Sequence, residues 1–331
     1  MLRGCHAWLL VVSLGVSLGL PLVDSLRAEE VPQATALASL LELLDSPRFI
    51  ERRRAQGELE KLSLAELAPL RPLIKESPSA EVRAQLRFLF NSAEHRELSK
   101  AFEKLATGKG DNDLDLEEAM WLVTLLSDPD PSREEMKREL DALAELVRRR
   151  MPAEAARDPR RAMETLHAAL YGERKFRINF PDYDNLANAS ALEVLRKNRG
   201  LPITLGVVTV LVAQRLKLPI VGIATPGRYL VKYQAKPNVP HSPDDIFLDP
   251  IEEGRVTTID QVTEEFADTN RIGGEADTIL APASHRATLR RMLTNVISAL
   301  RHLGEDRRVD RVELYLRLVG EERMLTPPKQ K

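Results

Sequence analysis

Apolar residues recur at helical spacing through the first part of the chain, about residues 33–96. They fall in short runs that are separated by helix-breaking prolines and serines. Two of these breaks, Asp45-Ser-Pro and Glu76-Ser-Pro, echo each other at a spacing near that of HEAT-type repeats. We therefore predict HEAT-like helical hairpins over residues 33–96, with an ordinary helical bundle as the alternative.

The remainder of the chain mixes helical and strand-like patterns. Apolar residues at helical spacing predict helices over residues 114–126, 133–150, 160–170, 189–197 and 204–216, and a final pair over 282–319. Short β-rich runs lie at residues 220–224, 229–233 and 246–248. Pro226-Gly227 separates the first two runs, as a hairpin turn would. This order of elements predicts an α+β fold that is mostly helical.

The N-terminus has the pattern of a secretory signal peptide. Arg3 precedes a nearly continuous apolar run over residues 7–23, and the small residue Ala28 follows. We expect cleavage near Ala28, so that residues 1–28 are removed and the protein is exported to the periplasm or the medium. The alternative is an uncleaved membrane anchor formed by residues 7–23, the only case in which we expect contact with a membrane.

Composition and cysteine usage narrow the classes of function. Cys5 is the only cysteine, so cleavage would leave a chain with neither disulfides nor a thiol nucleophile. The net charge of -2 and the aromatic content of 5% argue against a nucleic-acid partner. The histidines show no close ligand spacing, so we predict no metal site, and nothing in the sequence indicates a cofactor.

An ordered series of motifs resembles a known family. Gly200-Leu-Pro-Ile-Thr-Leu-Gly, Pro226-Gly-Arg-Tyr-Leu-Val and Leu248-Asp-Pro look like the SirB-type transglutaminase-like family. The resemblance implies a papain-like fold and covers roughly residues 97–319. We assign residues 97–270 to the transglutaminase-like domain and residues 281–320 to a helical C-terminal extension.

The resemblance also implies where a catalytic triad would lie. The nucleophile position of the catalytic relatives falls at or beside Thr204, the histidine position at Arg228, and the aspartate position at Asp249. A threonine hydroxyl is a weak nucleophile unless a base takes its proton, and an arginine stays protonated and cannot act as that base. His241, in the loop before Leu248, is considered as a substitute base.

Each of these positions also has a non-catalytic interpretation. Thr204 is expected to be the N-cap of its helix, and Asp249 to pair with Arg228 across neighbouring strands. Because arginine offers a two-pronged donor face, Arg228, Asp249 and Thr204 together would form a ligand site for a carboxylate or another anion.

We therefore predict a non-catalytic binding or scaffolding protein with a protein or peptide partner. Stacked helical hairpins over residues 33–96 would supply one docking surface. The alternative is a hydrolase or acyl transferase that uses Thr204 as its nucleophile, with Asp249 and His241 in support.

Overall fold

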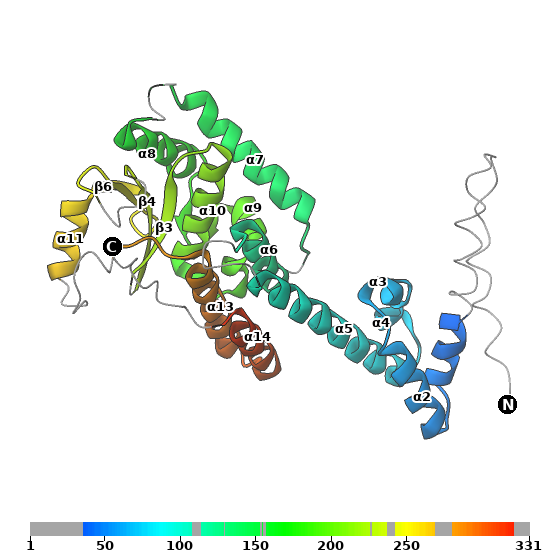
Figure 1. Ribbon diagram of the computed structural model, residues 1–331. Helices are drawn as coiled ribbons and strands as arrows, with labels where there is room; N and C mark the ends of the chain where they lie inside the picture. Colours follow the sequence, from blue (N-terminus) through cyan, green and yellow to red (C-terminus); the bar gives the residue numbers. More distant parts are fainter. Residues whose placement is uncertain are drawn as a thin grey trace, which may run out of the picture. The chain divides into compact units, whose positions relative to one another are not determined.

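The computed structural model describes residues 36–107, 114–128, 130–152, 154, 157–225, 227–236, 242–268 and 280–320. The chain divides into two compact units, Met1–Glu97 and Leu98–Lys331. The boundary falls within one long helix, α5 (Ala80–Ala106). The structure confirms the predicted fold class, an α+β protein that is mostly helical (Figure 1).

The described part of the first unit is built from short helices. Residues 36–44 are helical, and they are followed by α2 (Phe49–Leu59), α3 (Leu64–Leu67), η1 (Ala68–Leu70), α4 (Leu73–Glu76) and the first part of α5. Ser63 caps α3 in a capping box with Glu66, which satisfies two backbone N–H groups at the helix start. The helices share one core that includes Leu44, Leu59 and Leu86. The HEAT-like repeat stays a prediction.

The second unit begins with three helices, each of which starts at a polar N-cap residue. They are α6 (Leu116–Ser127), α7 (Arg133–Arg150) and α8 (Pro159–His167), capped by Asp115, Ser132 and Asp158. A π-helix, η3 (Ala168–Glu173), follows α8 directly. Next come η4 (Phe180–Asp182), η5 (Leu186–Ala189), α9 (Ala191–Lys197) and α10 (Pro202–Arg215). Two short strands, β1 (Arg177–Ile178) and β2 (Arg199–Gly200), pair in parallel among them.

The main sheet is antiparallel and follows the chain order. It consists of β3 (Ile220–Thr225), β4 (Arg228–Tyr233), β5 (Ile246–Asp249) and β6 (Arg255–Thr258). Thr225 pairs with Arg228 across the tight turn, and Asp249 pairs with Arg255. The hairpin predicted around Pro226-Gly227 is therefore present, whereas β6 was not expected from the sequence.

The two faces of the sheet pack against different helices, because successive strand residues point to opposite faces. Tyr229 and Val231 of β4 belong to the core that contains α10, whereas Leu230 and Phe247 pack with Val262 of α11 (Ile259–Asp268). Figure 1 shows α10 and α11 on opposite sides of the sheet. A side chain's position along a strand therefore decides which helix it can reach.

Helix α10 is the centre of the larger core. Every residue from Pro202 to Ala213 is buried, which explains why its sequence is apolar on all sides. Gly206 lets the helix approach the sheet, since a Cβ at this position would lie 2.5 Å from Cδ1 of Tyr229. Tyr229 in turn lies over Gly222, where a Cβ would come within 1.9 Å of the tyrosine hydroxyl. The aromatic ring is thus held between the helix and the sheet by two glycines.

The predicted C-terminal helical pair consists of α13 (His285–His302) and α14 (Asp306–Val319). Its apolar residues join the same core as α6 and α10, and the Phe102 ring of α5 stacks on Tyr315 with centroids 4.8 Å apart. In the described part of the chain, no helix has the length and apolar character needed to cross a membrane. The predicted signal segment, residues 1–28, lies outside the described residues.

Replacing Gly206 with alanine should destabilise the second unit. The new methyl group would collide with the buried Tyr229 ring, and overpacking of this kind costs about 1–3 kcal/mol. Gly172→Ala is the control, because Gly172 is also helical and its nearest neighbour is a backbone oxygen at 3.8 Å. Urea denaturation should show a lower midpoint for Gly206→Ala alone; equal midpoints for the two variants would contradict the packing described here.

Candidate functional site

Thr204 lies in the first turn of α10, but it does not cap the helix. Leu201 is the N-cap residue and Pro202 is the first helical residue. The prediction that Thr204 is the N-cap is therefore wrong. The reason is that proline, with its fixed φ and missing N–H, is well suited to the first helical position, so the helix begins two residues earlier. Thr204 itself is 1% exposed.

Arg228 and Asp249 meet across neighbouring strands. Arg228 is the first residue of β4 and Asp249 is the last residue of β5. The Nη2 atom of Arg228 lies 2.5 Å from Oδ2 of Asp249, and the two side chains are 20% and 2% exposed. The other carboxylate oxygen accepts the backbone N–H of Ile251 at 2.8 Å. The cross-strand pair expected from the sequence is therefore present.

Two glutamates and a second arginine complete the arrangement. Arg228 also lies 2.6 Å from Glu252 and 3.0 Å from Glu265 of α11. The Nε atom of Arg255 lies 2.5 Å from Glu252, and its Nη2 donates to Glu265. We call Arg228, Asp249, Glu252, Arg255 and Glu265 the arginine–carboxylate cluster. It ties β4, β5, β6 and the intervening turn to α11.

The cluster keeps Arg228 charged. Burial lowers the pKa of Arg228, but the charge of Asp249 and the hydrogen bonds to Glu265 and Glu252 outweigh it, so the pKa is raised overall. Burial raises the pKa of Asp249, and the charge of Arg228 and the Ile251 N–H offset only part of that rise. The net effect on Asp249 is unfavourable because its carboxylate is almost completely buried, whereas Arg228 still reaches solvent.

The sheet separates this pair from Thr204. Arg228 shares a face of β4 with Leu230, and Asp249 shares a face of β5 with Phe247, which is the α11 side of the sheet. Helix α10, which carries Thr204, packs against the opposite face. Within the described part of the chain, no hydrogen bond joins the Thr204 hydroxyl to Arg228 or Asp249. The three triad positions are thus not assembled into one reactive group.

Among the described residues, no identified hydrogen bond joins the Thr204 hydroxyl to a histidine. Three described histidines have identified partners: His167 contacts the carbonyl of Gly254, His285 that of Leu114, and His302 the carboxylate of Asp184. His241, the substitute base considered from the sequence, lies outside the described residues. Acyl transfer through Thr204 therefore has no identified proton acceptor.

Arg228 has little capacity left for a ligand. Its guanidinium is shared by three carboxylates, from Asp249, Glu252 and Glu265. An added anion would have to displace one of them, and removing the partner of a buried charge is unfavourable. The ligand role of Arg228, Asp249 and Thr204 stays a prediction, and this geometry counts against it.

The cluster is equally unsuited to a metal ion. Among the residues that the structure describes, no group of three His, Cys, Asp or Glu side chains is arranged to hold one. The carboxylates of the cluster are bound to Arg228 and Arg255, whose positive charges would repel a cation at the same place.

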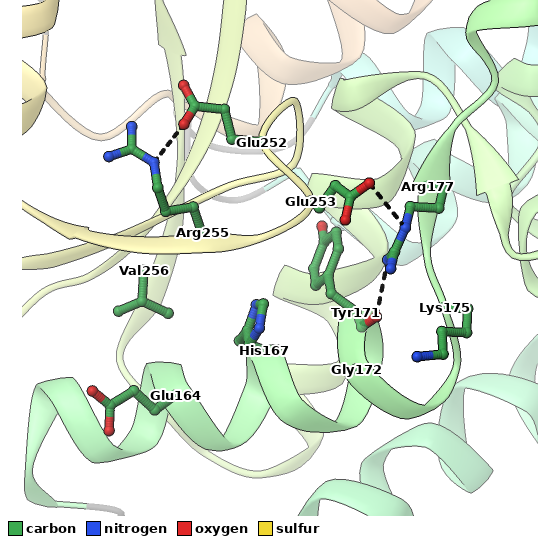
Figure 2. Close-up of a pocket in the computed structure, with 10 residues that line it drawn as sticks. All are labelled: Glu164, His167, Tyr171, Gly172, Lys175, Arg177, Glu252, Glu253, Arg255 and Val256. Carbon is green, nitrogen blue, oxygen red and sulfur yellow. Dashed lines mark hydrogen bonds and ion pairs between the residues drawn. The ribbon is translucent and has the colours of Figure 1, made fainter.

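A cavity borders the cluster on its other side. Its volume is about 510 Å³, and it lies between α8 with η3 on one side and the turn before β6 on the other (Figure 2). Glu252 and Arg255 of the cluster contribute to its wall, and His167 and Tyr171 to its floor. The sequence analysis missed it. The available signal was the i, i+4 spacing of His167, inside the helix predicted over residues 160–170, and Tyr171, directly after its end.

Comparison with known proteins agrees with this architecture. Residues 134–294 match the family model of the transglutaminase-like superfamily. These residues form a transglutaminase-like superfamily domain. The match includes α10, the sheet and all of the arginine–carboxylate cluster. No solved structure matches the chain significantly.

Two curated relatives from Xylella fastidiosa are similar to part of the chain. A UPF0162 protein of strain Temecula1 / ATCC 700964 is 29% identical over 142 residues, which are 41% of this chain and 48% of the relative. A UPF0162 protein of strain 9a5c is 28% identical over 164 residues, or 47% of this chain and 56% of the relative. The chain thus spans about half the length of the curated relatives that it matches.

Substitution of Arg228 by leucine should destabilise the transglutaminase-like domain by about 3 kcal/mol, because it leaves the buried Asp249 without its cation. Arg301→Leu is the matched control, since Arg301 forms an exposed pair with Glu313 that should contribute about 0–1 kcal/mol. Urea denaturation of both variants measures the difference. Equal losses would show that the cluster is no more important than a surface ion pair.

The loss in Arg228→Leu should also depend on pH. Burial already raises the folded-state pKa of Asp249, and removing the charge of Arg228 raises it further. A carboxylate whose pKa is raised by folding reduces stability above that pKa, and the penalty disappears once the group is protonated. The variant should therefore lose less stability at about pH 5 than at about pH 8. A loss that does not change with pH would rule out an uncompensated Asp249 charge as its cause.

Proposed function

We propose that this chain is a non-catalytic transglutaminase-like binding or scaffolding protein. The observation that carries the proposal is the ion pair of Arg228 with Asp249 at 2.5 Å. In a triad of this kind, the base must accept a proton and the aspartate must orient that base. Here a permanently protonated side chain holds the aspartate, so the position of the base has no group that can accept a proton.

The position of Thr204 supports the same proposal. Its side chain is buried in α10, and the sheet separates it from Arg228 and Asp249. A hydroxyl nucleophile needs an adjacent base and access to substrate. Thr204 has neither among the described residues.

The proposed partner is a protein or a peptide, and the proposed location is outside the cytoplasm. The helical hairpins of the first unit would present an extended docking face, as stacked hairpins do in repeat proteins. Export would follow from the signal-peptide pattern of residues 1–28. The proposal places the chain within the SirB-type branch of the transglutaminase-like proteins, on the motifs around Gly200, Pro226 and Leu248.

An activity assay tests the absence of catalysis. We expect purified protein to show no turnover of nitrophenyl esters, of peptide amides, or of glutamine substrates with an added amine. Thr204→Ala removes the nucleophile that the family resemblance implies. Thr209→Ala is the matched control, because Thr209 is also buried in α10 and its hydroxyl donates to the Leu205 carbonyl. Turnover that disappears in Thr204→Ala and persists in Thr209→Ala would establish the hydrolase or acyl transferase instead.

A further inference from the structure

The cavity beside the cluster combines several features that reduce stability. The Tyr171 hydroxyl is completely buried beside Thr209 of α10, but no described atom forms a hydrogen bond of good geometry with it, so the hydroxyl is poorly satisfied. Tyr171 lies in η3, where the Arg174 N–H donates to the carbonyl of Ala169 in the π-helical pattern. Single π-helical turns of this kind are frequent at functional sites.

Backbone strain is concentrated at the same place. The described part of the chain has four non-glycine residues with positive φ, and two of them, Lys175 at 61° and Glu253 at 53°, line this cavity. Gly254 beside them has φ of 75°, and a Cβ there would lie 2.3 Å from the Tyr171 ring. A non-glycine residue with positive φ costs free energy, and such residues occur more often at active sites and ligand-binding sites than elsewhere. Positive φ angles, a π-helix and a poorly satisfied buried hydroxyl are thus concentrated around this one cavity.

The charges in the cavity are arranged along its length. Figure 2 shows Glu164 near one end and Lys175 near the other, with His167 and Tyr171 between them. Arg177 is paired with Glu253 at 3.2 Å, but Lys175 forms no ion pair with any described residue. Among the described residues, the ion-pair partner of Glu164 is Arg160, at a long distance of 3.7 Å. The cavity therefore offers an available cation at one end and an available carboxylate at the other.

His167 provides an acceptor between these two charges. Its Nδ1 lies 2.8 Å from the carbonyl oxygen of Gly254. A carbonyl oxygen can only accept, so Nδ1 carries a proton, and in the neutral tautomer with this proton Nε2 is an acceptor. A ligand that crosses the cavity can therefore donate an N–H to His167.

Strand β6 gives the cavity a direction. The strand is at the edge of the sheet, where its outer side pairs with no other described strand, and it runs from the turn of Glu253 through Arg255 and Val256 toward the Glu164 end (Figure 2). The opposite edge is different, because Ala283 donates to the Gly222 carbonyl of β3 at 2.8 Å. An extended peptide antiparallel to β6 would have its amino end toward Glu164 and its carboxyl end toward Lys175.

We propose that this cavity binds a short extended peptide through its free C-terminal carboxylate. Lys175 receives the carboxylate, His167 accepts a backbone N–H, and the peptide lies along β6 with its amino end toward Glu164, in the manner of strand addition. The choice of a peptide as the ligand rests on the proposed function, in which the partner is a protein or a peptide. It does not depend on the absence of catalysis.

Affinity selection tests the site. Full-length mature protein is incubated with random pentapeptides that end in a free carboxylate, and in parallel with the same peptides made as C-terminal amides. Bound peptides are identified by mass spectrometry, and the affinity of the most enriched one is measured by fluorescence anisotropy. Lys175→Ala removes the proposed carboxylate receptor. Lys217→Ala is the matched control, because Lys217 is an exposed lysine with a similar φ of 57° and does not line the cavity.

We expect enrichment from the free-acid peptides and not from the amides. Lys175→Ala should weaken binding about tenfold, as expected for loss of a charge-assisted hydrogen bond, and Lys217→Ala should leave it unchanged. Absence of enrichment, equal enrichment of acids and amides, or equal affinity of Lys175→Ala and the wild type would each overturn the proposal. Cleavage of a bound peptide, visible in the same mass spectra, would instead overturn the proposed lack of catalysis and leave the binding site in place.

Discussion

A carboxylate as deeply buried as Asp249 requires a cation beside it, because an uncompensated charge in the protein interior is strongly destabilising. In a catalytic triad the corresponding carboxylate faces a histidine, whose charge changes during the reaction. In this chain it faces Arg228, whose charge does not change. The remaining N–H donors of Arg228 pair with Glu252 and Glu265. Because Glu265 belongs to α11, these ion pairs connect the sheet to that helix.

Much of the fold could be predicted from the sequence, because its signals are local. Apolar residues at helical spacing indicated α6, α7 and α8, and Pro226-Gly227 indicated a turn between two β-rich runs. Strand β6 was missed since Arg255–Thr258 is short and has no clear alternation. The start of α10 was misplaced because the preference of Pro202 for the first helical position was not used.

The candidate site was harder to predict, because its contacts join residues far apart in the chain. Glu265 reaches Arg228 across 37 positions, and no local pattern indicates such a contact. The motif comparison placed Thr204, Arg228 and Asp249 in one site by analogy with catalytic relatives. Strand alternation decides otherwise, since the two charged residues lie on the Phe247 side of the sheet. The family resemblance identified the three positions, but only the packing of the sheet shows that Arg228 meets Asp249 and that Thr204 lies on the other face.

The cluster and the cavity depend on each other through one turn. Glu252 is held by Arg228 and Arg255, and the turn that follows it presents the Gly254 carbonyl to Nδ1 of His167. The ion pairs of the cluster thereby also hold the carbonyl that places a proton on Nδ1 of His167. Ion pairs between permanently charged groups hold the wall of a binding cavity in place at any physiological pH. A catalytic proton relay instead needs a side chain that can take up and release a proton. Arg228 at the position that the family resemblance gives to the histidine therefore supports the proposed binding role at this edge of the sheet.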